Sequence, residues 1–166
     1  MDLIPRPKGP WHELEASFEM EMIVFIGLQG SGKSSFYQKS FSGSHVRLNL
    51  DMLKTRRREQ ALFETCLEVG QRFVIDNTNP GPEDRLRYLL PATAARFNCL
   101  AYYFNVPLET CLERNAGRTG KSRIPDKGIL ATARKLAAPR PDEGFSEIYV
   151  VDADGHAVKQ GQTNAI

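Results

Sequence analysis

Eight residues near the start of the chain have the types and spacing of a phosphate-binding loop. Gly27 to Ser34 reads GLQGSGKS and fits the pattern G-x-x-x-x-G-K-S/T. Glycines let backbone N–H groups turn toward phosphate oxygens, Lys33 can reach the β- and γ-phosphates, and the Ser34 hydroxyl can hold Mg²⁺. The loop therefore predicts a site for ATP and Mg²⁺, and a glycine-rich turn without a ligand is the alternative. The residues predicted to contact the nucleotide are Gly27, Gly30, Ser31, Gly32, Lys33, Ser34, Ser35 and Arg114.

Two aspartates follow apolar runs and could act on a hydroxyl or on a metal. Asp51 closes the alternating segment 45–51, and Asp76 closes the apolar run 73–75. Ligands bind beyond the carboxyl ends of parallel strands, so both carboxylates should lie on the same sheet edge as the loop. We interpret Asp51 as the general base for an attacking hydroxyl, with a cap on the following helix as the alternative. Asp76 could support the water shell of the metal, hold a neighbouring cation or cap its strand.

Two basic clusters could bind phosphate groups. In the segment 54–58, Lys54 or Arg58 could contact an acceptor phosphate, whereas the two arginines between them are expected on the solvated surface. The second cluster surrounds the glycine-rich segment 117–120, which is predicted to be a mobile lid. Arg118 is the predicted lid arginine, because a cation there could neutralise charge on a transferring phosphoryl group.

The rest of the sequence must place these side chains on one scaffold. Apolar or alternating runs over 22–27, 45–51, 72–77, 99–106 and 147–152 predict five strands, and helical patterns lie between them. Strands separated by helices give a parallel sheet covered on both faces. The prediction is a three-layer α/β P-loop NTPase domain with a five-stranded, mainly parallel sheet and a helical, basic lid. The expected boundaries are an irregular arm over 1–20, the P-loop kinase domain over 21–153 and a polar tail over 154–166.

The composition is that of an ordinary globular domain. The chain has 166 residues, of which 41% are hydrophobic and 25% are charged, and this argues against a disordered or fibrous protein. A net charge of +2 neither requires nor excludes nucleic acid as a partner. The three cysteines have no zinc-binding spacing, and no apolar run is long enough to span a membrane. We therefore expect free thiols, a cytoplasmic location and no membrane partner.

Several segments resemble the kinase domain of the polynucleotide 5′-hydroxyl kinases, a family of phage and DNA-repair enzymes. The resemblance covers residues 22–152 in order, and its carriers are IGLQGSGKS (26–34), LNLDML (48–53), VIDNTNP (74–80), FNVPLETCLERNAGR (104–118), SRIP (122–125) and EGFSEIYVV (143–151). The resemblance implies ATP-dependent transfer of the γ-phosphate to the 5′-OH of RNA or DNA. It also implies that Asp51 is the general base, that Lys33 and Ser34 contact ATP and Mg²⁺, and that Arg118 bridges donor and acceptor phosphates.

The same resemblance implies that Asp76 orients a substrate-binding cation, for which Lys54 or Arg58 is the local candidate. The sequence also departs from the family. Leu50 stands where a basic residue commonly precedes the base, and Lys54 stands where the phage type has an arginine. Two other functions stay open: a kinase for a small-molecule alcohol such as a nucleoside, a sugar acid or a nucleotide-sugar, and an ATP-binding regulatory module without catalysis.

Overall fold

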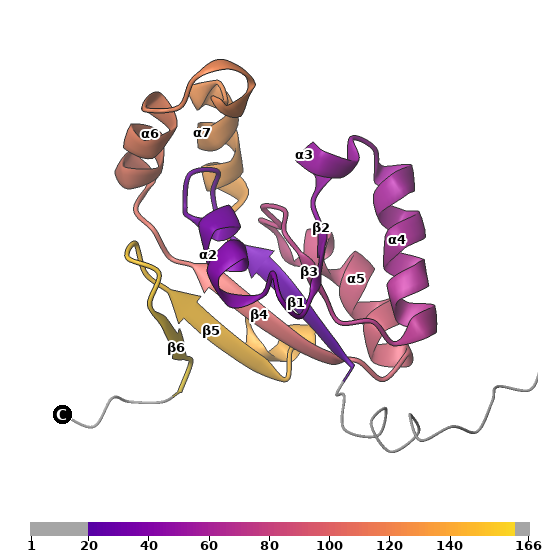
Figure 1. Ribbon diagram of the computed structural model, residues 1–166. Helices are drawn as coiled ribbons and strands as arrows, with labels where there is room; N and C mark the ends of the chain where they lie inside the picture. Colours follow the sequence, from indigo (N-terminus) through magenta and orange to yellow (C-terminus); the bar gives the residue numbers. More distant parts are fainter. Residues whose placement is uncertain (1–19, 162–166) are drawn as a thin grey trace, which may run out of the picture.

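A six-stranded sheet forms the centre of the molecule (Figure 1). The computed structural model describes residues 20–161, so most of the predicted arm over 1–20 and the last five residues of the predicted tail lie outside the described residues. The strand order is β2-β3-β1-β4-β5-β6, and every neighbouring pair is parallel except β5 and β6. This confirms the predicted α/β class and the mainly parallel sheet. The strands are β1 (Glu21–Ile26), β2 (Val46–Leu48), β3 (Phe73–Ile75), β4 (Asn98–Phe104), β5 (Glu147–Val151) and β6 (Ala157–Lys159).

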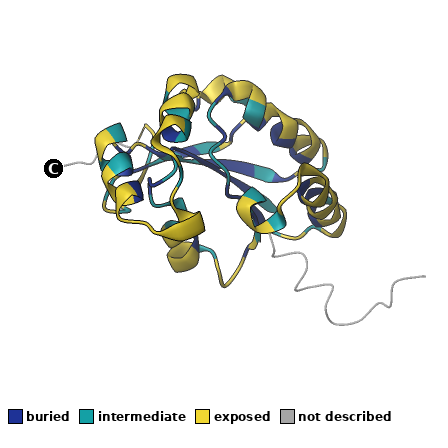
Figure 2. Cartoon of the chain, turned by 90° about the horizontal axis from the view of Figure 1, so that it is seen from above, coloured by how far each residue is buried: buried dark blue, intermediate teal, exposed yellow. Residues whose placement is uncertain are grey.

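Helices cover both faces of the sheet because the central strand is apolar on both sides. In β1, Met22 and Val24 face one layer, whereas Ile23 and Phe25 face the other, and all four are 0% exposed. The first face packs against α4 (Arg56–Val69) and α5 (Pro82–Ala94). The second packs against α2 (Lys33–Ser40) and α6 (Leu108–Ala116). Figure 2 shows the buried strands between helices whose outer sides are exposed, which confirms the three-layer prediction.

The sheet has one strand more than the sequence predicted. β6 lies in the segment predicted as a polar tail, and it follows a tight turn organised by one aspartate. Oδ1 of Asp152 accepts hydrogen bonds from the N–H groups of Asp154 and His156, each at 2.9 Å. The chain then returns antiparallel to β5, and the Lys159 ammonium donates to the Glu147 carboxylate at 2.7 Å. Three residues at a sheet edge give too short a pattern for the strand to be predicted.

Most of the remaining elements flank the carboxyl ends of the strands. They are the short helix α3 (Leu50–Leu53), the 3₁₀ turn η1 (Gly120–Ser122) and α7 (Asp126–Lys135), whereas the 3₁₀ turn η2 (Pro141–Glu143) lies near the amino-terminal end of β5. Figure 1 shows α6 and α7 on one side of this edge and α3 on the other, with the β1–α2 loop between them. Within residues 20–161, no helix has the length and apolarity needed to cross a bilayer.

Candidate active site

The phosphate loop is the turn between β1 and α2, as the motif predicts. Gly30 and Gly32 have φ angles of 84° and 97°, in the left-handed region that favours glycine. A Cβ atom at Gly30 would lie only 2.6 Å from the carbonyl oxygen of Cys111, so a larger residue does not fit. The first turn of α2, which the structure describes in full, contains no acidic residue. The helix N-terminus therefore presents its N–H groups and positive dipole end without a competing carboxylate.

The ammonium of Lys33 lies within this loop. It donates to the carbonyl oxygens of Gly27 at 2.9 Å and Leu28 at 2.6 Å, and to Oγ of Ser31 at 3.4 Å. Loss of solvation lowers the pKa of Lys33 to about 8, although the nearby Asp76 carboxylate acts in the opposite direction. A desolvated ammonium held by neutral carbonyls gains when an anion reaches it, since charge-assisted hydrogen bonds are stronger. The position suits the phosphate contact predicted for Lys33.

Asp76 pairs with Arg47, which corrects the expectation that Lys54 or Arg58 would be its cation. The Arg47 Nη2 atom lies 2.6 Å from Oδ2 of Asp76, and Nε donates to the same oxygen at 2.7 Å. Nη2 also donates to Oγ of Ser34 at 2.7 Å. The guanidinium thus joins the strand-end carboxylate to the predicted metal ligand.

The strand register explains why Arg47 reaches the loop. Arg47 lies opposite Val74, which packs on the α2 side, whereas Leu48 packs on the opposite face of the sheet. Its guanidinium carbon lies 5.3 Å from the ring centroid of Tyr37 on α2, a distance typical of a cation–π contact. Arg47 was not among the site residues predicted from the sequence. It lies next to a core leucine in an alternating segment, and this alternation places its side chain on the opposite face of the strand from that leucine.

Asp51 lies in the first turn of α3 and not at the end of a strand, which corrects the predicted position. β2 ends at Leu48, and the next residue, Asn49, starts the helical turn. Oδ1 of Asn49 accepts a hydrogen bond from the Met52 N–H at 3.1 Å, and its Nδ2 donates to the carbonyl of Asp76 at 2.6 Å. An asparagine side chain that caps the backbone favours a turn over a continued strand.

A network of hydrogen bonds from the segment after β3 and from α4 holds the α3 turn in place. Oδ1 of Asn77 accepts from the Leu50 N–H at 3.0 Å, and its Nδ2 donates to Oε1 of Glu59 at 2.5 Å. Glu59 is 3% exposed, and its other oxygen accepts from Nη1 of Arg56 at 2.7 Å. Buried polar groups that are all paired rigidify the segment that they hold. Asn77 and Glu59 were not among the residues predicted from the sequence. Arg56 was expected on the solvated surface, and its side chain is 53% exposed although it also pairs with Glu59.

One cavity of about 410 Å³ brings most of the predicted site residues together. Its wall contains the loop lysine, both predicted acids and the lid arginine, together with Asn49, Arg56 and Asn77 from the α3 support. Cations and carboxylates therefore face the same space as the helix N-terminus. The predicted site residues in the wall are Gly30, Gly32, Lys33, Ser34, Ser35, Asp51, Asp76 and Arg118.

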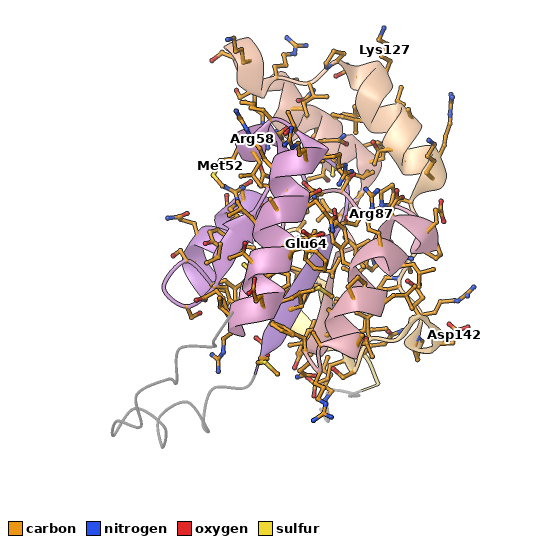
Figure 3. The ribbon with its side chains drawn as sticks, turned by 90° about the vertical axis from the view of Figure 1, so that its right-hand side faces the viewer. Met52, Arg58, Glu64, Arg87, Lys127 and Asp142 are labelled. Atoms are coloured by element: carbon orange, nitrogen blue, oxygen red, sulfur yellow. The ribbon has the colours of Figure 1, made fainter. Side chains whose placement is uncertain are left out.

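Two predicted substrate contacts lie outside this wall. Lys54 has a φ of 71°, and its ammonium donates to the carbonyl of Asp51. Arg58 donates to the carbonyl of Leu53 at 3.3 Å, and Figure 3 shows it near the upper end of α4. Among the described residues, the cavity wall includes Arg56 and neither of these two. The structure thus does not bring Lys54 and Arg58 together with the other predicted residues.

A second cavity of about 310 Å³ adjoins the first. Arg114 and Ser31 line it, and Arg114 donates to the carbonyls of Gly30 at 3.4 Å and Ala153 at 2.6 Å. Arg114 thereby ties the phosphate loop to the β5–β6 turn, next to the space where the rest of a nucleotide could lie. The residues shared by the two cavities are Gly30, Gly32, Ser35 and Arg118.

The predicted lid is anchored by one buried asparagine. Asn115 is 0% exposed, and its Nδ2 donates to the carbonyl of Ile124 at 2.6 Å and to Asp126 at 3.2 Å. Its Oδ1 accepts from the Ile124 N–H at 3.0 Å. Asn115 therefore closes the base of the loop that contains Arg118, while the Arg118 side chain lines both cavities. Asn115 was not among the site residues predicted from the sequence.

Comparison with known proteins gives relatives that are similar to this chain in sequence. A protein of Acanthamoeba polyphaga mimivirus, named as a candidate bifunctional polynucleotide phosphatase/kinase, is 43% identical over 139 residues, which are 79% of this chain and 33% of that protein. The bifunctional polynucleotide phosphatase/kinase of Schizosaccharomyces pombe is 25% identical over 146 residues, covering 86% of this chain and 36% of that protein. The chain thus spans about a third of the length of these curated relatives.

The solved structures support the fold, and a family model gives the membership. A gluconokinase from Sinorhizobium meliloti superposes with a TM-score of 0.57 at 16% identity, over 82% of this chain and 85% of that one, a likeness of fold alone. The family described as an AAA domain matches residues 22–139. These matches confirm the resemblance to the polynucleotide kinases in sequence, and the chain belongs to the AAA domain family of P-loop proteins.

Proposed function

We propose that this chain is a kinase that transfers the γ-phosphate of ATP to a hydroxyl acceptor, with the 5′-OH end of RNA or DNA as its preferred acceptor. One observation carries the proposal. Asp51 lines the same 410 Å³ cavity as Lys33 of the phosphate loop, so a residue that can accept a proton shares the space in which a γ-phosphate would lie. A nucleotide switch has no need of such a base, whereas transfer to an alcohol does.

The reaction follows from these positions. Lys33 exchanges its carbonyl partners for the β- and γ-phosphate oxygens of ATP. Asp51 accepts the proton of the acceptor hydroxyl while the hydroxyl oxygen bonds to the γ-phosphorus. The bond between that phosphorus and the β–γ bridging oxygen breaks, and ADP leaves with the electron pair. Arg118, which lines both cavities, neutralises charge on the phosphoryl group as it moves.

The oxygen donors near the loop fit Mg²⁺. Oγ of Ser34 and Oδ2 of Asp76 both contact one cationic nitrogen of Arg47, at 2.7 and 2.6 Å. Mg²⁺ prefers oxygen ligands, and these two oxygens already lie close to a positive charge, that of the Arg47 guanidinium. When bound, the metal supplies charge neutralisation for the β- and γ-phosphate oxygens. Ser34 would hold it directly, and Asp76 would support its water shell.

Two observations bear on the acceptor. The two curated relatives described above are named for polynucleotides, which favours a nucleic acid end. Against this, Lys54 and Arg58 lie outside the cavity wall, and the cations besides Lys33 in that wall are Arg56 and Arg118. This shortage of additional phosphate contacts favours the second candidate, a kinase for a small alcohol.

An acceptor screen tests the proposal. The purified chain is incubated with γ-labelled ATP and Mg²⁺, and with 5′-OH oligonucleotides of RNA and DNA, nucleosides and sugar acids. We expect labelled 5′ ends. Transfer to sugars or nucleosides but not to oligonucleotides would replace the leading acceptor with a small molecule. ATP binding without transfer to any alcohol would favour the regulatory module.

A further inference from the structure

Arg47 lies where the loop hydroxyl and the strand-end acid meet. Its Nη2 atom is 2.7 Å from Oγ of Ser34 and 2.6 Å from Oδ2 of Asp76, so a single nitrogen contacts both oxygens. The Asp76 side chain is 2% exposed, whereas that of Arg47 is 24% exposed. A buried carboxylate needs a cation close by, and this one is an arginine that retains contact with solvent.

The position of Arg47 is fixed by two elements. Its backbone belongs to β2, and its side chain crosses to α2, where it contacts Ser34 and stacks over the ring of Tyr37. Ser34 and Tyr37 are three residues apart, so they lie on the same face of the helix. The guanidinium is therefore held beside the first turn of α2, at the end of the helix that forms the phosphate site.

The proposed function gives the same two oxygens to the Mg²⁺ site, with Oγ of Ser34 as a direct ligand and the Asp76 carboxylate as an acceptor for the water shell of the metal. A magnesium ion bonds to its oxygen ligands at roughly 2.0–2.1 Å and requires a near-octahedral shell. The Arg47 nitrogen already occupies the space between the hydroxyl and the carboxylate, and like charges this close repel strongly. The metal and the guanidinium therefore compete for one place.

We propose that Arg47 is a built-in counter-cation of the metal site, which Mg²⁺ must displace when it binds with the nucleotide. This inference rests on the proposed function for the identity of the metal site. In the absence of metal, Arg47 neutralises Asp76 and holds Ser34. When the metal binds, the guanidinium turns toward solvent. Arg47 thus weakens metal binding in the free protein, and the nucleotide phosphates supply the additional ligands that overcome it.

Metal affinity, measured without catalysis, tests this competition. Mn²⁺ prefers the same octahedral oxygen donors as Mg²⁺, and its free concentration can be followed by electron paramagnetic resonance. The full chain is titrated with Mn²⁺ in the absence of nucleotide and with saturating ADP. We expect Arg47→Met to bind Mn²⁺ about tenfold more tightly than the natural protein under both conditions, as for a typical coupling between two ligands of one site.

Three further variants separate competition from a change in overall charge or in folding. Arg57→Met removes an exposed arginine from α4 and should leave Mn²⁺ affinity unchanged. The double variant Arg47→Met/Asp76→Asn should lose the gain in Mn²⁺ affinity, since that gain comes from the Asp76 carboxylate that the removal of Arg47 leaves unpaired. Arg47→Lys keeps the charge but lacks the planar fork, and it should show a smaller gain of the same sign even if Arg47→Met fails to fold.

The outcomes are distinguishable from a failure of the proposed function. Equal or weaker Mn²⁺ binding by Arg47→Met and Arg47→Lys overturns the inference, as does a gain that persists in the double variant or recurs in Arg57→Met. ADP binding is measured separately by calorimetry in a chelating buffer. Absence of ADP binding would overturn the nucleotide site, whereas the comparison of Mn²⁺ affinities without nucleotide would still decide the role of Arg47.

Discussion

The two halves of the candidate site are built in opposite ways. The phosphate half is local, because the backbone angles of residues 30–32 and the start of α2 set its geometry within one turn. The acceptor half is assembled from distant segments. The turn that carries Asp51 is held by Asn49 beside it, by Asn77 after β3 and by Glu59 on α4.

This difference indicates which changes to the protein should disturb each half of the site. The phosphate half depends on glycines and on one buried charge, so backbone changes and pH should act on it. The acceptor half depends on a chain of hydrogen bonds, so the loss of one side chain should move the base without touching the nucleotide. Four predictions, beginning with the largest expected effect, could break this separation or sharpen it.

Asp51→Asn should remove the proposed general base and leave the phosphate half intact. We expect turnover to fall by a factor on the order of 10²–10⁴, which is the usual contribution of a general base. Affinity for ATP should change little, because no described hydrogen bond joins the Asp51 side chain to the loop. Steady-state kinetics and calorimetry measure the two quantities. Asp142→Asn, an exposed acid on η2, is the control (Figure 3). Comparable losses in turnover and in ATP affinity would contradict the assignment of Asp51.

Lys33 should make ATP affinity depend on pH. Its pKa is lowered from 10.5 to about 8, and phosphates bind the protonated form. As pH rises through about 8, the free protein loses this proton, so binding must take one up, and affinity should fall about tenfold for each further pH unit. Calorimetry in buffers of different ionisation enthalpy detects the proton taken up. Lys127→Met, an exposed lysine on α7, should keep this pH slope, whereas Lys33→Met should bind weakly and without it. An ATP affinity that does not change with pH in the natural protein would contradict the lowered pKa of Lys33.

Asn77→Ala tests the acceptor half through a residue that need not touch the substrate. The change leaves the Leu50 N–H and the Glu59 carboxylate without one partner each, and we expect a loss of about 1–3 kcal/mol of stability. Turnover should fall several-fold while the Kd for ATP stays constant, because the α3 turn loosens and the loop does not. Gln60→Ala is the matched control on α4, since the Gln60 side chain donates to an exposed neighbour on the same helix, Glu64. An Asn77→Ala variant that loses stability but keeps its turnover would make the network purely structural.

The place of the local half in the fold followed from the sequence. The spacing of the phosphate loop predicts a turn between a strand and a helix, and Lys33, Ser34 and Ser35 line the larger cavity there. Their contacts with a nucleotide stay a prediction. Three-layer architecture followed from strands that are apolar on both faces. These features depend on residues that are close together in the sequence, so the pattern of residue types is enough to predict them.

The rest required the fold. Two basic residues after Asp51 were the predicted partners of Asp76, but the strand register brings Arg47 to it from the neighbouring strand β2. Asn77 meets Glu59, which lies 18 residues earlier in the sequence. Hydrogen bonds between distant segments leave no periodic signal. The edge strand β6 was missed for a different reason, since three residues are too few for alternation to be read.

Lys54 offers the smallest effect and the finest test of the acceptor half. It ends α3 with a φ of 71°, a conformation that costs a lysine more than a glycine. Lys54→Gly should therefore stabilise the protein by about 0.5–1 kcal/mol, provided that the relief of strain exceeds the loss of the ammonium contact with the Asp51 carbonyl. Denaturant unfolding measures this change, and Lys54→Asn, which tolerates the same conformation, should fall between the two. If the ammonium also binds an acceptor phosphate, both variants should raise the KM for oligonucleotides but not for ATP. An unchanged oligonucleotide KM would remove Lys54 from the substrate contacts and leave Arg56 and Arg118 as the cations of that half.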